Sequence, residues 1–389
     1  MHIAQRVTYF QESVIREMTR LAMDYDAINL SQGYPDFDAP LALKDAAVNA
    51  IRDGSNQYTF TWGYLPLREK LAEQYTSLLG WTVEPTEHVT VTCGVTEAIN
   101  VAMLALSNPD DEVLVIEPAH ENVIPAIVLA GAKPVPVPLK HPEYRLDPEQ
   151  LGACITHRTC AMLLNTPHNP TGRVLDAEEL GIVTNLAQQH DIVLITDEIY
   201  DRILYDGRRH FPPGGLEQLR ERTITIGGLS KTFAITGWRL GYMIAPTRLM
   251  RAIRPVHDFL TICAPAPLQI AAVTALNFAQ DYYDDMLADY HQRRDIMIRI
   301  LKDLGFTLTI PEGAYYVLAD YSRMGIPQAQ WDSRDFAEWM VREYRVAVVL
   351  GSVFYSLPGY GNRCVSFAFS KKMETLLDAG ERLRNMKPS

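Results

Sequence analysis

Seven short apolar runs between residues 89 and 245 place the strongest constraint on how this 389-residue chain folds. Helical segments at Thr96–Leu106, Ala177–His190 and Thr247–Phe259 alternate with them. The runs are Val89–Thr92, Glu112–Ile116, Pro134–Leu139, Cys160–Leu164, Ile192–Thr196, Thr223–Ile226 and Leu240–Ala245. Near-continuous apolar strands that alternate with amphipathic helices are typical of a mostly parallel sheet covered on both faces. We therefore predict an α/β fold with a large three-layer domain built around a mostly parallel seven-stranded sheet.

The two ends of the chain follow a different pattern. Residues 1–30 carry a helical pattern that ends near Asp24–Asp26, and helices are also predicted at Leu41–Asp53 and Tyr64–Leu79. A long helix is predicted from Leu268 to about Leu304. Helices then alternate with four predicted strands, at Phe306–Ile310, Tyr315–Leu318, Val346–Leu350 and Val365–Phe369. This rhythm predicts a smaller α+β unit, which begins within the long helix near residue 285.

Composition and charge exclude several classes of partner. The 36 Lys and Arg residues against 47 Asp and Glu give a formal charge of −11, and there is no basic run, so neither nucleic acid nor an anionic membrane is expected as a partner. No stretch reaches the ~18–20 apolar residues of a membrane span. Residues 1–6 are not followed by the apolar segment of a secretory signal. Five scattered cysteines without a CxxC motif fit a reducing cytoplasm and predict no metal site.

A lysine and an arginine follow the predicted strand Thr223–Ile226. Lys231 comes just after the strand, and in an apolar pocket its amine would lose its proton and could form a Schiff base with an aldehyde. Arg239 offers the donor geometry that suits a phosphate, and the small residues Gly228 and Ser230 let backbone N–H groups approach it. An aldehyde and a phosphate on one ligand indicate pyridoxal phosphate. The alternative is a turn whose lysine points to solvent.

Polar groups follow three other predicted strands, where ligands of parallel sheets bind. Asn169 lies in the proline-containing loop after Cys160–Leu164, although a plain Asn-Pro turn would also explain it. Asp197 ends the next strand and would pair with a pyridinium nitrogen, with Tyr200 able to donate to a ring oxygen; alternatively, Asp197 caps a helix. Val95 and Thr96 open a helix, whose N-terminus is a ready phosphate site.

These segments resemble a known family in order and spacing. Asn165–Gly172, Asp197–Tyr200 and Gly228–Gly241 are similar to the motifs of class I/II aminotransferases of the fold type I pyridoxal-phosphate family. Asn29–Phe37 and Gly361–Phe369 extend the resemblance over nearly the whole chain. It implies a large cofactor-binding domain of residues 36–285 and a small domain formed by residues 1–35 and 286–389.

The resemblance also implies a role for each site residue. Lys231, Asp197 and Tyr200 would be catalytic. Lys231 would hold the cofactor as an internal aldimine and then carry the proton between the substrate Cα and the cofactor C4′. Asp197 would pair with the pyridine nitrogen, and Tyr200 would bind the ring oxygen. The phosphate would be bound by Val95, Thr96, Ser230 and Arg239, with Tyr58 reaching across a dimer interface. Asn169 would contact both cofactor and substrate. Arg363 would clamp the substrate α-carboxylate, with Gly33 closing over it; an edge-strand ion pair is the alternative for Arg363.

Two positions depart from the family pattern. Gly228 stands where a serine is frequent, so one phosphate hydrogen bond is expected to be missing. His120 stands where an aromatic ring usually stacks on the cofactor. Plain stacking by the imidazole is favoured, and the alternatives are a structural histidine or a proton donor to the substrate.

The leading hypothesis is a cytoplasmic homodimer with shared active sites that transfers the amino group of an L-amino acid to a 2-oxo acid by a ping-pong mechanism. It resembles the branch that handles aspartate, aromatic amino acids, methionine or glutamine. The alternative is a pyridoxal-phosphate lyase, cyclase or oxidase with the same site, which fold and cofactor alone do not exclude. A pyridoxal-sensing regulator would need an added DNA-binding helix pair, for which ~30 N-terminal residues leave no room.

Overall fold

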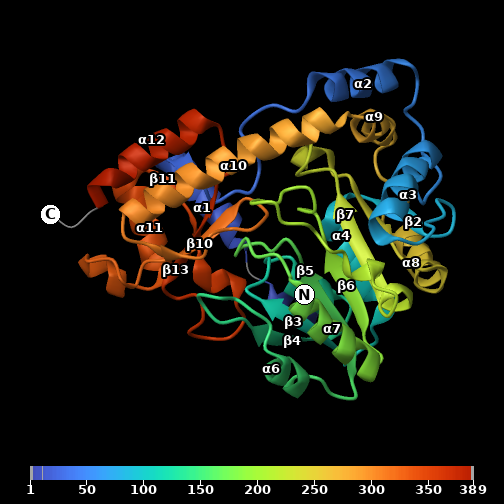
Figure 1. Ribbon diagram of the computed structural model, residues 1–389, viewed down its shortest axis with the longest axis horizontal. Coiled ribbons are helices and arrows are strands. Elements are labelled where there is room, and N and C mark those ends of the chain that lie inside the picture. Colours follow the sequence, from blue (N-terminus) through green and yellow to red (C-terminus); the bar gives the residue numbers. More distant parts are fainter. Residues whose placement is uncertain (1–2, 11, 387–389) are drawn as a thin grey trace.

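A seven-stranded sheet forms the centre of the larger part of the molecule (Figure 1). The computed structural model describes residues 3–10 and 12–386. Across the sheet the strands are β2 (Val89–Thr92), β8 (Gly241–Ile244), β7 (Thr223–Gly228), β6 (Val193–Asp197), β5 (Thr159–Asn165), β3 (Glu112–Glu117) and β4 (Lys133–Pro138). All neighbours are parallel except that β8 runs antiparallel to β2 and β7. The predicted mostly parallel sheet of seven strands is confirmed.

Helices cover both faces of this sheet, which explains the continuous apolar runs. Val113 and Val115 of β3 pack into a cluster with α4, α5 and α8, whereas Leu114 and Ile116 pack into another with α6 and α7. Successive strand residues point to opposite faces, so a strand buried on both sides is apolar throughout. The helices of this part are α2 (Leu41–Arg52), α3 (Leu65–Leu79), α4 (Gly94–Leu106), α5 (Val123–Leu129), α6 (Pro148–Ala153), α7 (Ala177–Gln189), α8 (Thr247–Leu260) and α9 (Ala266–Leu276).

A smaller α+β unit lies beside the large sheet. Its four-stranded antiparallel sheet has the order β12 (Val349–Leu350), β13 (Cys364–Ala368), β10 (Tyr316–Asp320) and β9 (Thr307–Leu308). Its helices are α1 (Val14–Asp24), α10 (Gln280–Asp303), α11 (Ser333–Tyr344) and α12 (Met373–Leu383). Met18 of α1 shares a core cluster with Phe336 and Phe367, and β1 (Ile28–Asn29) pairs with β11 (Val346–Ala347). The segment from α1 to β1 therefore packs with the C-terminal elements of the chain.

Two predicted elements are each divided in the structure. The helix expected from Leu268 to Leu304 is two helices, α9 and α10, because the Asn277 amide donates to the Val273 carbonyl (2.9 Å) and Phe278 turns onto the Phe233 ring. The strand expected at Val346–Leu350 is β11 and β12, which belong to different sheets. The division into domains at residues 35/36 and 285/286 stays a prediction; residue 285 lies within α10, whose start packs on the large unit and whose later turns pack on the small one.

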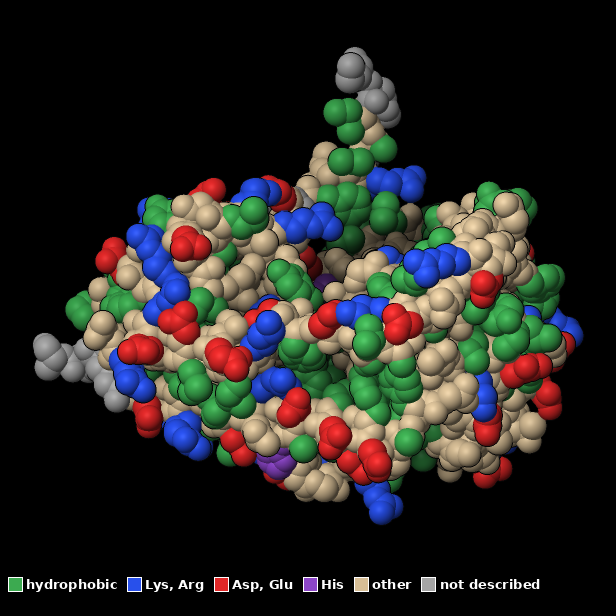
Figure 2. Space-filling model, turned by 90° about the horizontal axis from the view of Figure 1, so that it is seen from above, with side chains coloured by type: hydrophobic (Ala, Val, Ile, Leu, Met, Phe, Trp, Pro, Cys, Tyr) green, Lys and Arg blue, Asp and Glu red, His purple; other side chains and the backbone are tan. Residues whose placement is uncertain are grey.

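The carboxyl ends of β5, β6 and β7 meet the small unit in the middle of the molecule. Figure 2 shows a hollow on this side, beside the protruding N-terminal segment that contains the short helix η1 (Gln5–Tyr9).

Among residues 3–10 and 12–386, no helix is long and apolar enough to cross a membrane.

Candidate active site

Nine of the predicted site residues line one cavity of about 250 Å³ at the carboxyl ends of the large sheet's strands. They are Val95, Thr96, His120, Asn169, Asp197, Tyr200, Ser230, Lys231 and Arg239. They come from the segments after β2, β3, β5, β6 and β7, which the parallel topology brings to one edge.

Lys231 lies in this cavity just after β7. Burial lowers the pKa of its amine from 10.5 to about 8, with Arg239 lowering it further and Asp197 opposing the shift. Its Nζ donates to the Gly33 carbonyl (2.9 Å) and lies 5.6 Å from the centre of the Tyr315 ring. A lysine with this pKa is partly neutral near pH 7, so it can act as a nucleophile and as a base.

Asp197 ends β6 at the bottom of the cavity. Burial raises the pKa of its carboxyl from 3.8 to about 7, although the Ile199 N–H donates to Oδ1 (3.2 Å). On β5, Asn165 lies opposite Asp197 and donates to the Asp197 carbonyl (2.8 Å), while its own side-chain oxygen accepts from the Asn169 N–H (2.7 Å). A carboxylate buried in this position is costly unless it is paired, and a cationic N–H group is a suitable partner.

The opposite end of the cavity suits an anion. Helix α4 begins there at Gly94, and no side chain caps its N-terminus. Gly94 has a φ of +81°, and a Cβ on it would lie 2.3 Å from Nη2 of Arg239, so the guanidinium packs directly against the helix start. Arg239 uses Nη1 to bind the Thr236 carbonyl (3.0 Å). The uncapped helix end and this guanidinium together form an anion-binding site.

The glycine at position 228 is explained by its neighbours. A Cβ on Gly228 would lie 3.2 Å from both Cδ1 of Ile199 and Cγ2 of Val95. A serine would therefore be crowded by these two branched side chains.

The residues present fit pyridoxal phosphate. The anion site matches the phosphate, the buried Asp197 matches the pyridine nitrogen, and the Lys231 amine lies in the same cavity to meet the aldehyde. The Tyr200 hydroxyl lies 3.0 Å from that of Tyr316 and lines the cavity with Asn169, where both can donate to a ring oxygen.

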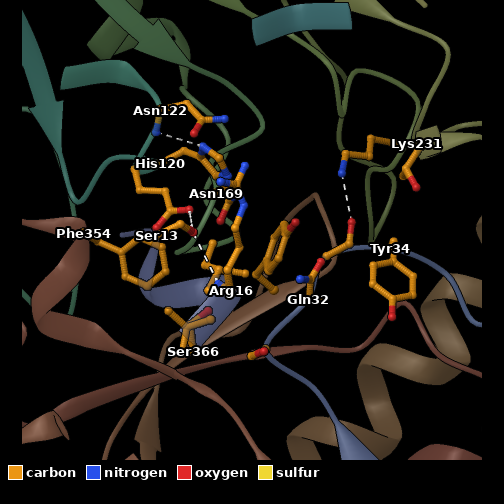
Figure 3. Close-up of a pocket in the computed structure, with 17 residues that line it drawn as sticks. Ser13, Arg16, Gln32, Tyr34, His120, Asn122, Asn169, Lys231, Phe354 and Ser366 are labelled. Carbon is orange, nitrogen blue, oxygen red and sulfur yellow. Dashed lines mark hydrogen bonds between the residues drawn. The ribbon is translucent and has the colours of Figure 1, made fainter. Parts of the chain in front are cut away.

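A second cavity of about 260 Å³ adjoins the first and shares His120, Asn169, Lys231 and Tyr316 with it. Its other walls come from α1, the loop 31–34, Glu121 after β3, the small sheet and η6 (Gly351–Phe354) (Figure 3). Gly33 lines this second cavity. A Cβ there would lie 1.8 Å from the Tyr316 hydroxyl, so only glycine lets this loop approach Tyr316 and present its carbonyl to Lys231.

The structure contradicts the role expected of Arg363. This side chain lies outside both cavities, and its Nη1 donates to the Ala329 carbonyl (2.5 Å). Position 363 precedes β13, whereas Ser366, three residues on, lines the second cavity. An odd number of residues along a strand reverses the face, so only one of these two positions can point into the site.

Tyr58 also lies outside both cavities of its own chain, with 77% of its surface exposed.

His120 lines both cavities, and burial together with the charge of Lys231 lowers the pKa of its imidazole to about 4. Its Nδ1 accepts from the Asn122 N–H (3.3 Å). The imidazole is therefore neutral across the physiological range of pH.

Sequence reasoning missed several lining residues, namely Arg16, Asn165, Tyr316, Phe354 and Ser366. Asn165 could have been found, because it ends the same predicted strand that precedes Asn169. The other four come from α1 and the small unit, and no local pattern shows that these segments reach the large sheet.

Comparisons with known proteins show the family of this chain. Residues 25–379 match the family model of aminotransferase class I and II. The chain is 34% identical to methionine aminotransferase of Escherichia coli (96% of each chain) and 36% identical to human kynurenine–oxoglutarate transaminase 1 (95% of each). Among solved structures, N-succinyldiaminopimelate aminotransferase from Mycobacterium tuberculosis superposes with a TM-score of 0.95 at 36% identity, over 99% of this chain and 100% of the other.

The chain belongs to the class I and II aminotransferases. It has the fold type I architecture of this family and is an enzyme that transfers amino groups with pyridoxal phosphate. The fold, cofactor and reaction class expected from the sequence are thus confirmed.

Proposed function

We propose that this aminotransferase acts on L-amino acids with a neutral, largely apolar side chain and passes the amino group to a 2-oxo acid. The observation that carries this proposal is the wall of the second cavity formed by Ile15, Val349 and Phe354, which offers apolar surface to a substrate side chain next to Lys231. Relatives named for methionine and for kynurenine support it.

The residue roles follow from the two adjoining cavities. Bound pyridoxal phosphate would supply an aldehyde and an electron-withdrawing ring. Lys231 would take the proton from the substrate Cα and deliver it to the aldehyde carbon of the cofactor, because an amine with a pKa of about 8 is well matched to both proton transfers near neutral pH. Asp197 would keep a proton on the pyridine nitrogen, and Tyr200 and Asn169 would hold the ring oxygen. In the cofactor-free chain, the Gly33 carbonyl accepts a hydrogen bond from the Lys231 amine.

The phosphate would be held by Arg239, Ser230 and the α4 N-terminus at Val95 and Thr96. His120 would face the cofactor ring as a neutral stacking partner, since its ring lines both cavities and has a depressed pKa.

We further propose a homodimer with shared active sites. Five large apolar side chains are strongly exposed on neighbouring segments, namely Tyr58, Phe60, Phe259, Leu260 and Ile262. The two segments are tied together, because Gln269 donates to the Thr59 hydroxyl (3.2 Å) and His257 lies 2.8 Å from the Thr61 carbonyl. Exposed apolar side chains on adjoining segments are typical of a protein interface. The cytoplasmic location stays a prediction.

Borohydride reduction of the purified protein tests the central assignment. The cofactor adduct should map to Lys231 and be absent from Lys231→Ala, which should also lose transamination of L-methionine and L-phenylalanine. The substrate proposal predicts that these two amino acids have a higher kcat/KM than L-aspartate. An adduct on another lysine would refute the assignment of Lys231, and a preference for L-aspartate would refute the substrate class.

A further inference from the structure

The small sheet offers no cation to the substrate cavity at the expected place. Ser366 is the residue of β13 that lines this cavity, and it pairs with Leu318 and Val349 of the neighbouring strands. Arg363 is held outside by the Ala329 carbonyl. An amino acid substrate still carries a carboxylate, so its positive partner must come from elsewhere.

Three Lys or Arg side chains line the two cavities among the residues that the structure describes: Arg16, Lys231 and Arg239. Lys231 is needed at the aldehyde, and Arg239 packs against the α4 N-terminus at the phosphate end. His120 is neutral, with its pKa near 4. This leaves Arg16.

Arg16 lies in the first turn of α1, which begins after the N-cap Ser13. Its side chain enters the second cavity on the same side as Asn169 and Ser366, whereas Lys231 and Tyr34 lie on the other side (Figure 3). This arrangement places a guanidinium, an amide and a hydroxyl around one part of the cavity wall.

Neither of two nearby carboxylates forms an ion pair with Arg16, although Glu121 also lines the second cavity. Glu12 forms a two-pronged ion pair with Arg20, and Glu121 accepts from the Ser13 hydroxyl. Within residues 3–10 and 12–386, the Arg16 guanidinium itself has no hydrogen bond or ion pair, so its planar fork of donors is available to a ligand. Such a fork matches a carboxylate in a bidentate geometry.

We propose that Arg16, rather than an arginine of β13, binds the α-carboxylate of the substrate, with Ser366 and Asn169 as flanking polar groups. This inference rests on the proposed function, since it assumes an amino acid substrate. It also fits the proposed preference for neutral side chains, because no other uncommitted cation among the described residues lines the cavities to bind a second carboxylate.

Isothermal titration calorimetry of the cofactor-loaded protein with 3-phenylpropionate, an unreactive acid, tests the proposal without relying on turnover. Arg16→Gln should weaken binding about 10- to 100-fold, the range for a charged hydrogen-bonded contact. Arg16→Lys should lie between the two, because it keeps the charge but loses the fork. The matched control, Arg363→Gln, should bind like the parent protein.

A second measurement compares substrates with and without the carboxylate. In Arg16→Gln, kcat/KM should fall for L-phenylalanine by the same factor, mainly through KM, and stay unchanged for any reaction with 2-phenylethylamine. Unchanged binding of 3-phenylpropionate by Arg16→Gln, no binding by the parent protein, or a loss in Arg363→Gln would each overturn the proposal. So would an effect confined to L-aspartate and L-glutamate. If Arg16 controls acid binding but neither L-phenylalanine nor L-methionine is a substrate, the proposed substrate class fails while the carboxylate site stands.

Discussion

Replacing Lys231 with methionine is expected to stabilise the cofactor-free protein, and the gain should shrink as the pH rises. The folded state holds the pKa of this lysine at about 8, against 10.5 for the free side chain, chiefly because the amine is buried. The folded state therefore binds its proton less tightly than the unfolded chain does, which costs stability at every pH where the unfolded lysine is protonated.

The magnitude follows from the difference between the two pKa values. A difference of 2.5 corresponds to about 3.4 kcal/mol in the free energy of unfolding, and this cost is fully present below pH 8. Between pH 8 and 10.5 it declines, and at pH 9.5 about 1.4 kcal/mol should remain. Methionine has similar length and no charge, so Lys231→Met removes the cost at all pH values.

Urea unfolding of both cofactor-free proteins at pH 7 and pH 9.5 measures this effect. The difference between the two proteins should be about 2 kcal/mol larger at pH 7 than at pH 9.5. Any contribution of methionine packing, or of the lost hydrogen bond to Gly33, is independent of pH and cancels in this comparison. A gain that does not change with pH would show that the amine is not desolvated as the structure indicates.

Three further predictions concern neighbouring residues. Gly33→Ala should lower kcat/KM at least about tenfold, because the new Cβ would lie 1.8 Å from the Tyr316 hydroxyl, and adding Tyr316→Phe should recover part of the loss; full activity of the single variant would contradict the close approach. His120→Phe should keep transamination and leave the pH–rate profile between pH 5 and 8 unchanged, since the imidazole has a pKa of about 4, and a shifted profile would show that His120 exchanges a proton. Mixing inactive Lys231→Ala with weakly active Tyr58→Phe subunits should restore activity above that of either variant, whereas a fully active monomer in sedimentation would exclude shared sites.

Much of the cofactor site could be predicted from the sequence because it depends on local rules. Each strand of the large sheet is buried on both faces and therefore apolar throughout, so its end is visible where polar residues begin. In a parallel sheet these ends meet at one edge, and this rule is enough to predict that Lys231, Asp197 and Asn169 lie together.

The residues on the substrate side of the site could not be predicted from the sequence in the same way. The expected cation near β13 depended on which residues of this strand face the cavity. Two residues three positions apart on a strand point to opposite faces of the sheet. The sequence contains Arg363 in the expected segment, but only the pairing of β13 with β10 and β12 shows that Ser366 lines the cavity instead.

The large sheet, the cofactor and the residues at the strand ends can thus be inferred from the sequence. Each strand and its end are visible as a local pattern of apolar and polar residues, and the parallel arrangement brings these ends together. The residues that surround the substrate are set by tertiary packing. Arg16 lies 215 positions before Lys231 in the chain, and they share a cavity because α1 packs on the small unit and the small unit packs on the large sheet. Such contacts depend on how elements far apart in the sequence pack against each other, and this packing cannot be predicted from a local sequence pattern.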